Sequence, residues 1–211
     1  MSEAITFLSK GGIMMIPLLL CSIIGFMIVI EKMISLRRNK ILIPEIISVV
    51  DSINSNQDIQ LATTICQKNK GPLPNIILTG LQNQNLPQEE IKEIINDEGR
   101  QQVRTLERGL PVLETIAGVS PLLGLLGTVL GMIRVFNNIM IHGTGNADKL
   151  AGGISEALIT TATGLFIGIP MLIAFNYFTD RAENFILDIE KYSTRLLQKI
   201  NVINNSSNDH L

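Results

Sequence analysis

Apolar residues gather along this chain in three long runs, separated by stretches where apolar positions recur at helical spacing. The runs cover residues 13–30, 111–136 and 151–179, and a helix that crosses a bilayer needs about 20 mostly apolar residues. No charged side chain occurs within 13–30, 115–133 or 157–179. One such run fits a soluble core helix, but three in a chain of 211 residues favour an integral membrane protein.

The stretch between the first two runs, residues 31–110, has the pattern of soluble helices. Apolar residues from Leu42 to Ile53 recur at helical spacing, and the sequence Lys70–Pro74 interrupts that pattern. Pro87 predicts a new helix start, followed by two glutamates that favour a first turn. We expect one long helix from about residue 88 through the second run, bent near Gly109 and Pro111.

The C-terminal part of the chain is expected to be helical and then to lose its order. Residues 180–203 carry an amphipathic pattern that follows the third run, whereas residues 204–211 are polar and are predicted to form a disordered tail.

The distribution of Lys and Arg predicts which side of the membrane each segment occupies. Ten of the 17 fall within residues 31–110 and four follow residue 179, whereas one precedes the first run and one lies in the connection 137–150. Because Lys and Arg accumulate on the cytoplasmic side, residues 1–12 and the 137–150 loop are predicted to be periplasmic. The 31–110 region and the C-terminus are predicted to be cytoplasmic.

Composition excludes several classes of function. The net charge of −2 provides no basic surface for nucleic acid. Cys21 and Cys66 lie in unlike surroundings, which predicts two reduced thiols, and no His or Cys cluster has metal-ligand spacing. Without a nucleophile–base pair or a metal set, we expect neither an enzyme nor a bound cofactor.

The second and third runs are rich in glycine, which lets helix backbones approach closely. Two GxxxG pairs occur, one in each run, and we interpret these glycines and Gly124 as helix-packing residues. They are Gly124, Gly127, Gly131, Gly164 and Gly168. The first run is mostly bulky and aliphatic, which suits a helix that faces lipid.

Glu156 is the most unusual residue of the third run. If the helix begins near Leu150, the carboxylate lies roughly 9 Å along it, where a charge is costly unless it is protonated, paired or hydrated. Alternatively, Glu156 marks a helix start, where a negative charge suits the helix dipole. Arg134, at the end of the second run, is either its partner or an interfacial residue.

Hydroxyl side chains extend this polar region. Thr160 and Thr163 lie roughly 40° and 20° from Glu156 around a helix, whereas Thr161 lies roughly 140° away. Thr128 is midway along the second run. Each threonine alone is expected to bond to its own helix, and a polar file of Thr128, Thr161 and Glu156 requires adjacent helices.

No Asp, Glu, His or Lys occupies the midpoint of any run. A proton that crosses here lacks a central titratable carrier. Either the protein moves no protons or a partner supplies the missing group.

Two long motifs resemble those of the MotA/TolQ/ExbB family. They are Pro121-Leu-Leu-Gly-Leu-Leu-Gly-Thr-Val-Leu-Gly-Met-Ile-Arg-Val-Phe136 and Gly153-Ile-Ser-Glu-Ala-Leu-Ile-Thr-Thr-Ala-Thr-Gly-Leu-Phe-Ile-Gly-Ile-Pro170. The resemblance implies an all-α integral membrane protein of three long helices that extend into the cytoplasm and form a ring, as a homopentamer. The family's pore threonines fall on Thr128 and Thr161, and its acidic residue falls on Glu156.

The resemblance also implies partners and a mechanism. A single-span protein of the ExbD/TolR type sits in the pore and carries the titrating aspartate, and rotation of the ring drives a TonB-like protein for outer-membrane transport. The stretch before the first run is shorter than in longer ExbB proteins, so a TolQ-like role in envelope integrity stays open. Sodium also stays open, because hydroxyls ligate either ion.

Two further classes of function compete with the motor. A membrane scaffold would conduct no ions and would need only the packing surfaces. A solute transporter fits less well, because three runs without inverted repeats offer no substrate site. A MotA-like role ranks last, since those proteins have four spans.

Overall fold

The computed structural model describes residues 11–53, 55–143 and 147–208, and every regular element in these ranges is an α-helix. The helices are α2 (Met15–Ser35), α3 (Arg38–Ile41), α4 (Pro44–Ser52), α5 (Asn56–Lys68), α6 (Pro72–Gln82), α7 (Gln88–Glu107), α8 (Leu110–His142) and α9 (Ala147–Asn208). Residues 1–10 and 209–211, which belong to the predicted periplasmic terminus and the predicted disordered tail, lie outside these ranges.

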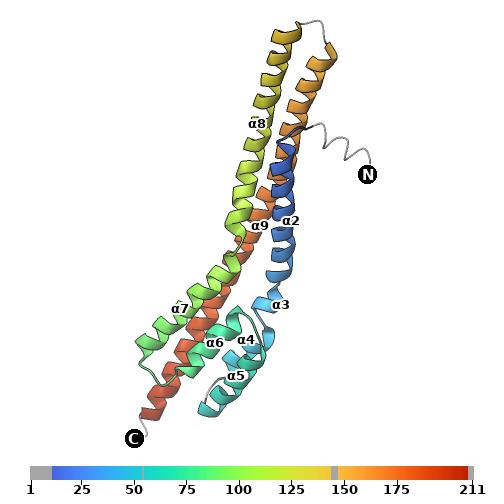
Figure 1. Ribbon diagram of the computed structural model, residues 1–211. Coiled ribbons are helices and arrows are strands. Elements are labelled where there is room, and N and C mark those ends of the chain that lie inside the picture. The colour runs from blue at the N-terminus through green and yellow to red at the C-terminus, as the bar shows by residue number, and fades with distance from the viewer. Residues whose placement is uncertain (1–10, 54, 144–146, 209–211) are drawn as a thin grey trace. The chain divides into compact units, whose positions relative to one another are not determined.

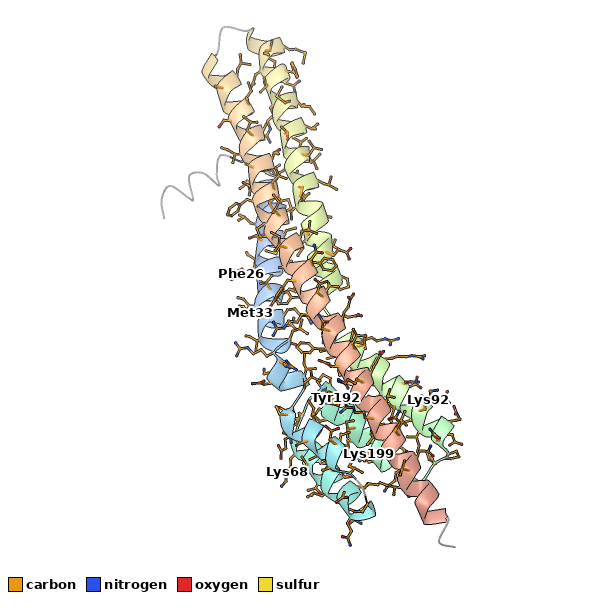
Figure 2. All side chains as sticks on the ribbon, turned by 180° about the vertical axis from the view of Figure 1, so that it is seen from behind. Phe26, Met33, Lys68, Lys92, Tyr192 and Lys199 are labelled. Carbon is orange, nitrogen blue, oxygen red and sulfur yellow. The ribbon has the colours of Figure 1, made fainter. Side chains whose placement is uncertain are left out.

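Among the described residues, three helical stretches are long and apolar enough to cross a membrane. They are α2, a stretch within Gln88–Ile141 and a stretch within Leu150–Ile203. In their most apolar windows 17%, 33% and 28% of the residues are buried, so most of the apolar surface is uncovered. Phe26 and Met33 on α2, labelled in Figure 2, are 61% and 58% exposed. Apolar surface of this extent requires a bilayer, and the chain is a multi-pass membrane protein.

The connection between α7 and α8 shows why glycine and proline stand together at this point. Gly109 has φ of 88°, a left-handed conformation that residues with a Cβ rarely adopt. Pro111 follows in the first turn of α8, where its missing N–H is harmless. The chain therefore has two helices here, whereas the sequence analysis expected one helix with a bend.

The α8–α9 connection is shorter than the predicted loop of residues 137–150. Apolar residues from Phe136 to Ile141 continue the helical pattern, and α8 ends only where Gly143 takes φ of 70°. The next helix begins at Ala147.

Helix α9 also extends beyond its predicted end, because it continues past residue 203 to Asn208. Ile200 and Ile203 are buried, and adding residues to an existing helix costs less than starting one. Residues 204–208, predicted to be disordered, are therefore helical.

The chain divides into two compact units. The first contains residues 1–31 and 109–177, and the second contains residues 32–108 and 178–211. In the first unit, α8 runs beside the first part of α9, and α2 lies along α9 (Figure 1). Gly25 faces Met171 at this α2–α9 contact, where a Cβ on the glycine would lie 2.7 Å from the sulfur.

In the second unit, α4, α5 and α6 pack in sequence order and α6 packs against α7. Ser55 and Asp58 form a reciprocal capping box at the start of α5, and Pro72 begins α6. The sequence analysis read Pro72 only as an interruption, although it starts a helix. The core includes Ile77, Ile91 and Leu196, and each of them is almost completely buried.

Candidate functional site

The site lies on the contact between α8 and α9 in the first unit, where glycines bring the two backbones together. A Cβ on Gly124 would lie 3.1 Å from the Cα of Thr161 and 3.3 Å from the Cα of Gly164. A Cβ on Gly164 would lie 2.5 Å from the carbonyl oxygen of Ser120. Backbone atoms cannot move aside as a flexible side chain can, so a Cβ at Gly164 would collide with α8, and one at Gly124 would be tightly crowded by α9.

The other predicted packing glycines lie along the same contact. A Cβ on Gly131 would lie 2.8 Å from the Cβ of Ala157, and one on Gly168 would lie 3.0 Å from the carbonyl oxygen of Ala117. Gly127 faces Thr160. All five glycines therefore lie where α8 meets α9.

This close approach brings Thr128 and Thr161 together. Their hydroxyl oxygens are 2.6 Å apart, and the Thr161 hydroxyl also donates to the carbonyl oxygen of Gly124 at 2.9 Å. The Thr128 hydroxyl lies 3.3 Å from that same carbonyl oxygen. Both side chains are half-buried, so the pair is joined across the two helices and is still partly accessible.

The protons of this pair can be accounted for. Each hydroxyl has one proton to donate. If Thr161 donates to Gly124, the short contact between the hydroxyls is made by the Thr128 proton. Two lone pairs then remain on the Thr128 oxygen and one on the Thr161 oxygen, and the pair can accept a hydrogen bond or ligate a cation.

Glu156 lies on a different side of α9 and has a partner of its own. Its carboxylate forms an ion pair with Arg134, with 2.5 Å between Oε1 and the guanidinium nitrogen. The Glu156 side chain is 23% exposed and that of Arg134 is 51% exposed. The structure thus pairs Glu156 with the partner considered from sequence, and it does not join Glu156 to the threonine pair.

The remaining predicted hydroxyls bond to backbone. Thr160 is buried and lies 2.6 Å from the carbonyl oxygen of Glu156 and 3.1 Å from that of Gly11. Thr163 donates to the carbonyl oxygen of Ile159 in its own helix, at 2.8 Å. None of these bonds reaches α8, so neither hydroxyl joins the two helices as the Thr128–Thr161 pair does.

Sequence reasoning missed two parts of this region. Gly11 and Gly12 come just before α2 and lie against Thr160 and Glu156, and two adjacent glycines carry no periodic signal. Ser120 is fully buried on α8 and donates to the carbonyl oxygen of Ile116 at 2.7 Å. Ser120 could have been singled out from the sequence, because it is a hydroxyl residue inside an apolar run.

The second unit contains cations that bind helix ends. Buried Lys32 donates to the carbonyl oxygen of Leu106, in the last turn of α7, at 2.9 Å. The sequence analysis counted Lys32 only as a charge that sets orientation. Arg181 donates from Nε to the carbonyl oxygen of Leu36, just after α2, at 2.7 Å. Both contacts satisfy carbonyls near helix C-termini, which favour cations.

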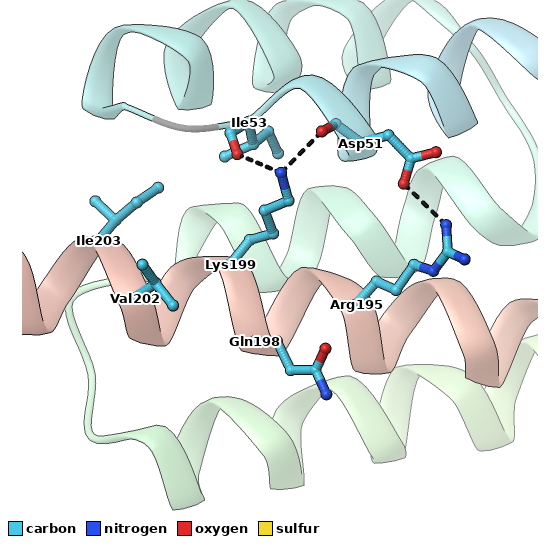
Figure 3. Close-up of a pocket in the computed structure, with 7 residues that line it drawn as sticks. All are labelled: Asp51, Ile53, Arg195, Gln198, Lys199, Val202 and Ile203. Carbon is cyan, nitrogen blue, oxygen red and sulfur yellow. Dashed lines mark hydrogen bonds and ion pairs between the residues drawn. The ribbon is translucent and has the colours of Figure 1, made fainter.

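A pocket in the second unit also contains cationic side chains that bind the end of a helix. Figure 3 shows Lys199 donating to the carbonyl oxygens of Asp51 and Ile53, at 2.8 and 2.9 Å, and Arg195 paired with the Asp51 carboxylate. The other lining residues are Gln198, Val202 and Ile203. These contacts join the end of α4 to α9, and we assign the pocket no ligand.

Within the part of the chain that the structure describes, no group of three His, Cys, Asp or Glu side chains is placed to hold a metal ion. The candidate site therefore consists of the threonine pair, the Arg134–Glu156 ion pair and the glycine contact that positions them.

Comparison with known proteins places this site inside a matched region. A family model described as the MotA/TolQ/ExbB proton channel family matches residues 68–191, which include α8 and the site residues of α9. ExbB-like 1 of Synechocystis sp. is 36% identical over 171 residues, which cover 79% of this chain and 66% of that protein. ExbB-like 3 of the same organism is 33% identical over 175 residues, which cover 80% of this chain and 81% of that protein.

A shorter match connects the chain to another named system. The Tol-Pal system protein TolQ of Pseudomonas aeruginosa is 44% identical over 81 residues, which cover 38% of this chain and 35% of that protein. Relatives named ExbB-like and relatives named TolQ therefore both match.

Proposed function

Because the chain belongs to the MotA/TolQ/ExbB proton channel family, we propose that it is the channel subunit of an ion-driven motor in the bacterial inner membrane. The observation that carries this proposal is the pair of threonine hydroxyls, 2.6 Å apart, on two helices that are apolar enough to span a bilayer. The hydroxyls satisfy each other across the two helices, and their side chains are still half exposed, so their remaining lone pairs can face an ion or a partner.

We propose that Thr128, Thr161 and Glu156 line the ion pathway. The hydroxyl pair offers lone pairs to a protonated acid or to a cation, and Glu156 provides negative charge at another level of α9. Neither hydroxyl titrates near neutral pH. The midpoints of the three runs also contain no Asp, Glu, His or Lys that could take up and release a proton there.

The missing group would come from a partner. We propose that the chain forms a homo-oligomeric ring, a pentamer, around a single-span protein of the ExbD/TolR type with an acidic residue in its span. Each proton that moves down the membrane potential supplies about 2.3 kcal/mol per 100 mV. Protonation and release at the partner's carboxyl would turn the ring.

The proposed output is work on the periplasmic side, through a TonB-like protein that energises outer-membrane transport. The matches to ExbB-like proteins support this assignment. The match to TolQ supports a second assignment, to envelope integrity and division. The two roles differ in the periplasmic partner and share the motor.

Co-purification tests the motor before its output is known. The full chain is expressed with a single-span protein of the ExbD/TolR type, whose span carries an acidic residue, extracted in mild detergent and weighed by native mass spectrometry. We expect a ring of this chain that holds one or two copies of the partner. An assembly that contains no single-span protein, under conditions that preserve the ring, would contradict the motor.

A non-conducting scaffold is the second candidate, and the extent of the α8–α9 glycine contact favours it. A scaffold needs that contact but has no use for the hydroxyls. It predicts that valine at Thr128 and Thr161 is tolerated, whereas bulky residues at Gly127 or Gly164 are not.

A further inference from the structure

Three segments of the first unit meet at Glu156. Arg134, from α8, forms the ion pair with the carboxylate. Thr160, one turn along α9, lies 3.1 Å from the carbonyl oxygen of Gly11. Gly12 packs directly against the carboxylate, because a Cβ built at Gly12 would collide with Glu156 Oε1.

The local geometry gives Gly12 a specific part. Its φ is 68°, a conformation that favours glycine, and the absence of a side chain leaves the space that the carboxylate occupies. Gly152, on α9, is a useful contrast because a Cβ built there would meet nothing within 4 Å. A side chain would therefore collide with its surroundings at Gly12 but not at Gly152.

The charges at this point are unequal in their access to water. The Glu156 side chain is 23% exposed, whereas the Arg134 side chain is 51% exposed. A carboxylate that is covered on several sides beside an apolar span is costly unless a cation compensates it. The guanidinium is always charged at physiological pH and its planar group suits a carboxylate.

We propose that Arg134 is a positioning residue that holds the Glu156 side chain in one place through the ion pair, with Gly12 providing the space for the carboxylate. The proposal rests on the proposed function only for the role of Glu156 in the ion pathway. In that pathway the Glu156 carboxylate, held beside the guanidinium, accepts hydrogen bonds from a fixed position, and the partner's carboxyl is the group that exchanges the ion.

A double-mutant cycle tests the pair. Arg134→Gln, Glu156→Gln and the double variant of the full chain are compared in lipid nanodiscs by thermal unfolding. Arg134→Gln should lower the melting temperature by several degrees, because it leaves the covered carboxylate uncompensated. In the Glu156→Gln background the same change should have almost no effect. Equal effects of Arg134→Gln in the two backgrounds would overturn the proposal.

Comparing Arg134→Lys with Arg134→Gln shows whether the positive charge at this position is what matters for activity. In cells that depend on the motor, Arg134→Gln should lower ion-driven activity about tenfold, the effect of losing roughly one hydrogen bond to a charged group. Arg134→Lys should keep most of the activity because it keeps the charge. Equal activity of the Lys and Gln variants would contradict the proposal.

Gly12→Ala supplies an independent check, with Gly152→Ala as the matched control. Gly12→Ala should lower the melting temperature, and part of this loss should be recovered in a Glu156→Ala background, where the collision is removed. Gly152→Ala should have little effect. No recovery in the Glu156→Ala background would contradict the assigned role of Gly12.

The outcomes separate this proposal from the proposed function. If the wild-type chain drives no ion-coupled process, the motor fails while the cycle still reports on the pair. If the cycle shows no coupling between Arg134 and Glu156 in a chain with full motor activity, the positioning role of Arg134 is wrong and the proposed function is unaffected.

Discussion

The hydroxyl of Thr161 has two oxygen neighbours, the carbonyl of Gly124 and the hydroxyl of Thr128. Thr163, two residues along the same helix, has a hydroxyl that donates to its own helix at Ile159. The two threonines thus share a helix and a side-chain type, and differ in whether the hydroxyl joins a second helix. This contrast makes Thr163 a matched control for Thr161.

Thr161→Val should abolish ion-driven activity while the ring still assembles. Valine keeps the shape, and the lost hydrogen bonds should lower stability by only about 1 kcal/mol. Growth that depends on the motor reports activity, and native mass reports assembly. Thr163→Val should leave growth close to that of the wild type. Full activity of Thr161→Val would favour the scaffold.

Cys66 offers a second prediction for a single residue, in the second unit. The side chain is 2% exposed, and burial raises the pKa of the thiol to about 11. At pH 8 the thiolate fraction should be about a hundredfold lower than that of an unfolded thiol with the ordinary pKa of 9.0. Because the thiolate is the reactive form, alkylation should be slowed at least in proportion.

The pH dependence of this reaction has a defined sign. The folded thiol should react about tenfold faster for each pH unit until about pH 11, whereas the unfolded thiol should level off near pH 9. Ionisation of the unfolded thiol also favours unfolding, so this residue lowers stability between those pH values. Iodoacetamide kinetics in a Cys21→Ser variant measure Cys66 alone. Equal rates in folded and denatured protein would contradict the burial.

At the scale of helices, the α8–α9 contact depends on backbone proximity. A Cβ on Gly164 would lie 2.5 Å from a backbone oxygen of α8, whereas a Cβ on Gly118, in α8 itself, would meet nothing within 4 Å. Alanine is otherwise favoured over glycine in a helix by up to about 1 kcal/mol. The two glycines therefore predict opposite effects of the same substitution.

Gly164→Ala should destabilise the protein by about 1–3 kcal/mol, the usual cost of overpacking. Gly118→Ala should leave stability unchanged or raise it slightly. Unfolding of the purified chain in detergent, followed by circular dichroism, compares them. Destabilisation by both substitutions to the same extent would argue against a specific contact at Gly164.

The same scale shows what the sequence could predict. The start of α7 after Pro87 and the irregular backbone at Gly109 follow from local chemistry, because proline and glycine restrict the backbone wherever they occur. The ends of α8 and α9 did not follow, because continuing a helix through a polar stretch depends on the residues already packed before it.

For the candidate site, the sequence could indicate the residues but not which of them contact one another. The residue types singled out Thr128, Thr161 and Glu156, and the family resemblance assigned them to the ion pathway, whereas Arg134 as the partner of Glu156 was one of two interpretations. Spacing could not show that Thr161 meets Thr128 while Glu156 meets Arg134, because this requires the rotation of one helix against another. Gly12 was missed because its partner lies far away in the sequence.

For the whole molecule, the main prediction is its orientation in the membrane, because this decides on which side each segment and each end of the proposed pathway lies. Ten of the 17 Lys and Arg lie within residues 31–110, which contain α3 to α7. Lys and Arg near the ends of a span favour the cytoplasmic side, and eight of these ten lie within about 20 residues of the first or second run: Lys32, Arg37, Arg38, Lys40, Lys92, Arg100, Arg104 and Arg108. With three spans, placing this region inside puts residues 1–12 and 143–146 outside and the C-terminus inside.

Single cysteines in a variant that lacks Cys21 and Cys66 measure this orientation. A membrane-impermeant maleimide added to intact spheroplasts should label cysteines at Ser2 and Thr144, and should label those at Ser55 and Ser207 only after lysis. Because each span reverses the side, four positions overdetermine the answer. Labelling of Ser55 in intact spheroplasts would invert the orientation and place Glu156 near the opposite membrane surface. In that orientation Glu156 would lie at the cytoplasmic end of the proposed pathway, and an ion entering from the periplasm would reach the threonine pair before it reaches Glu156.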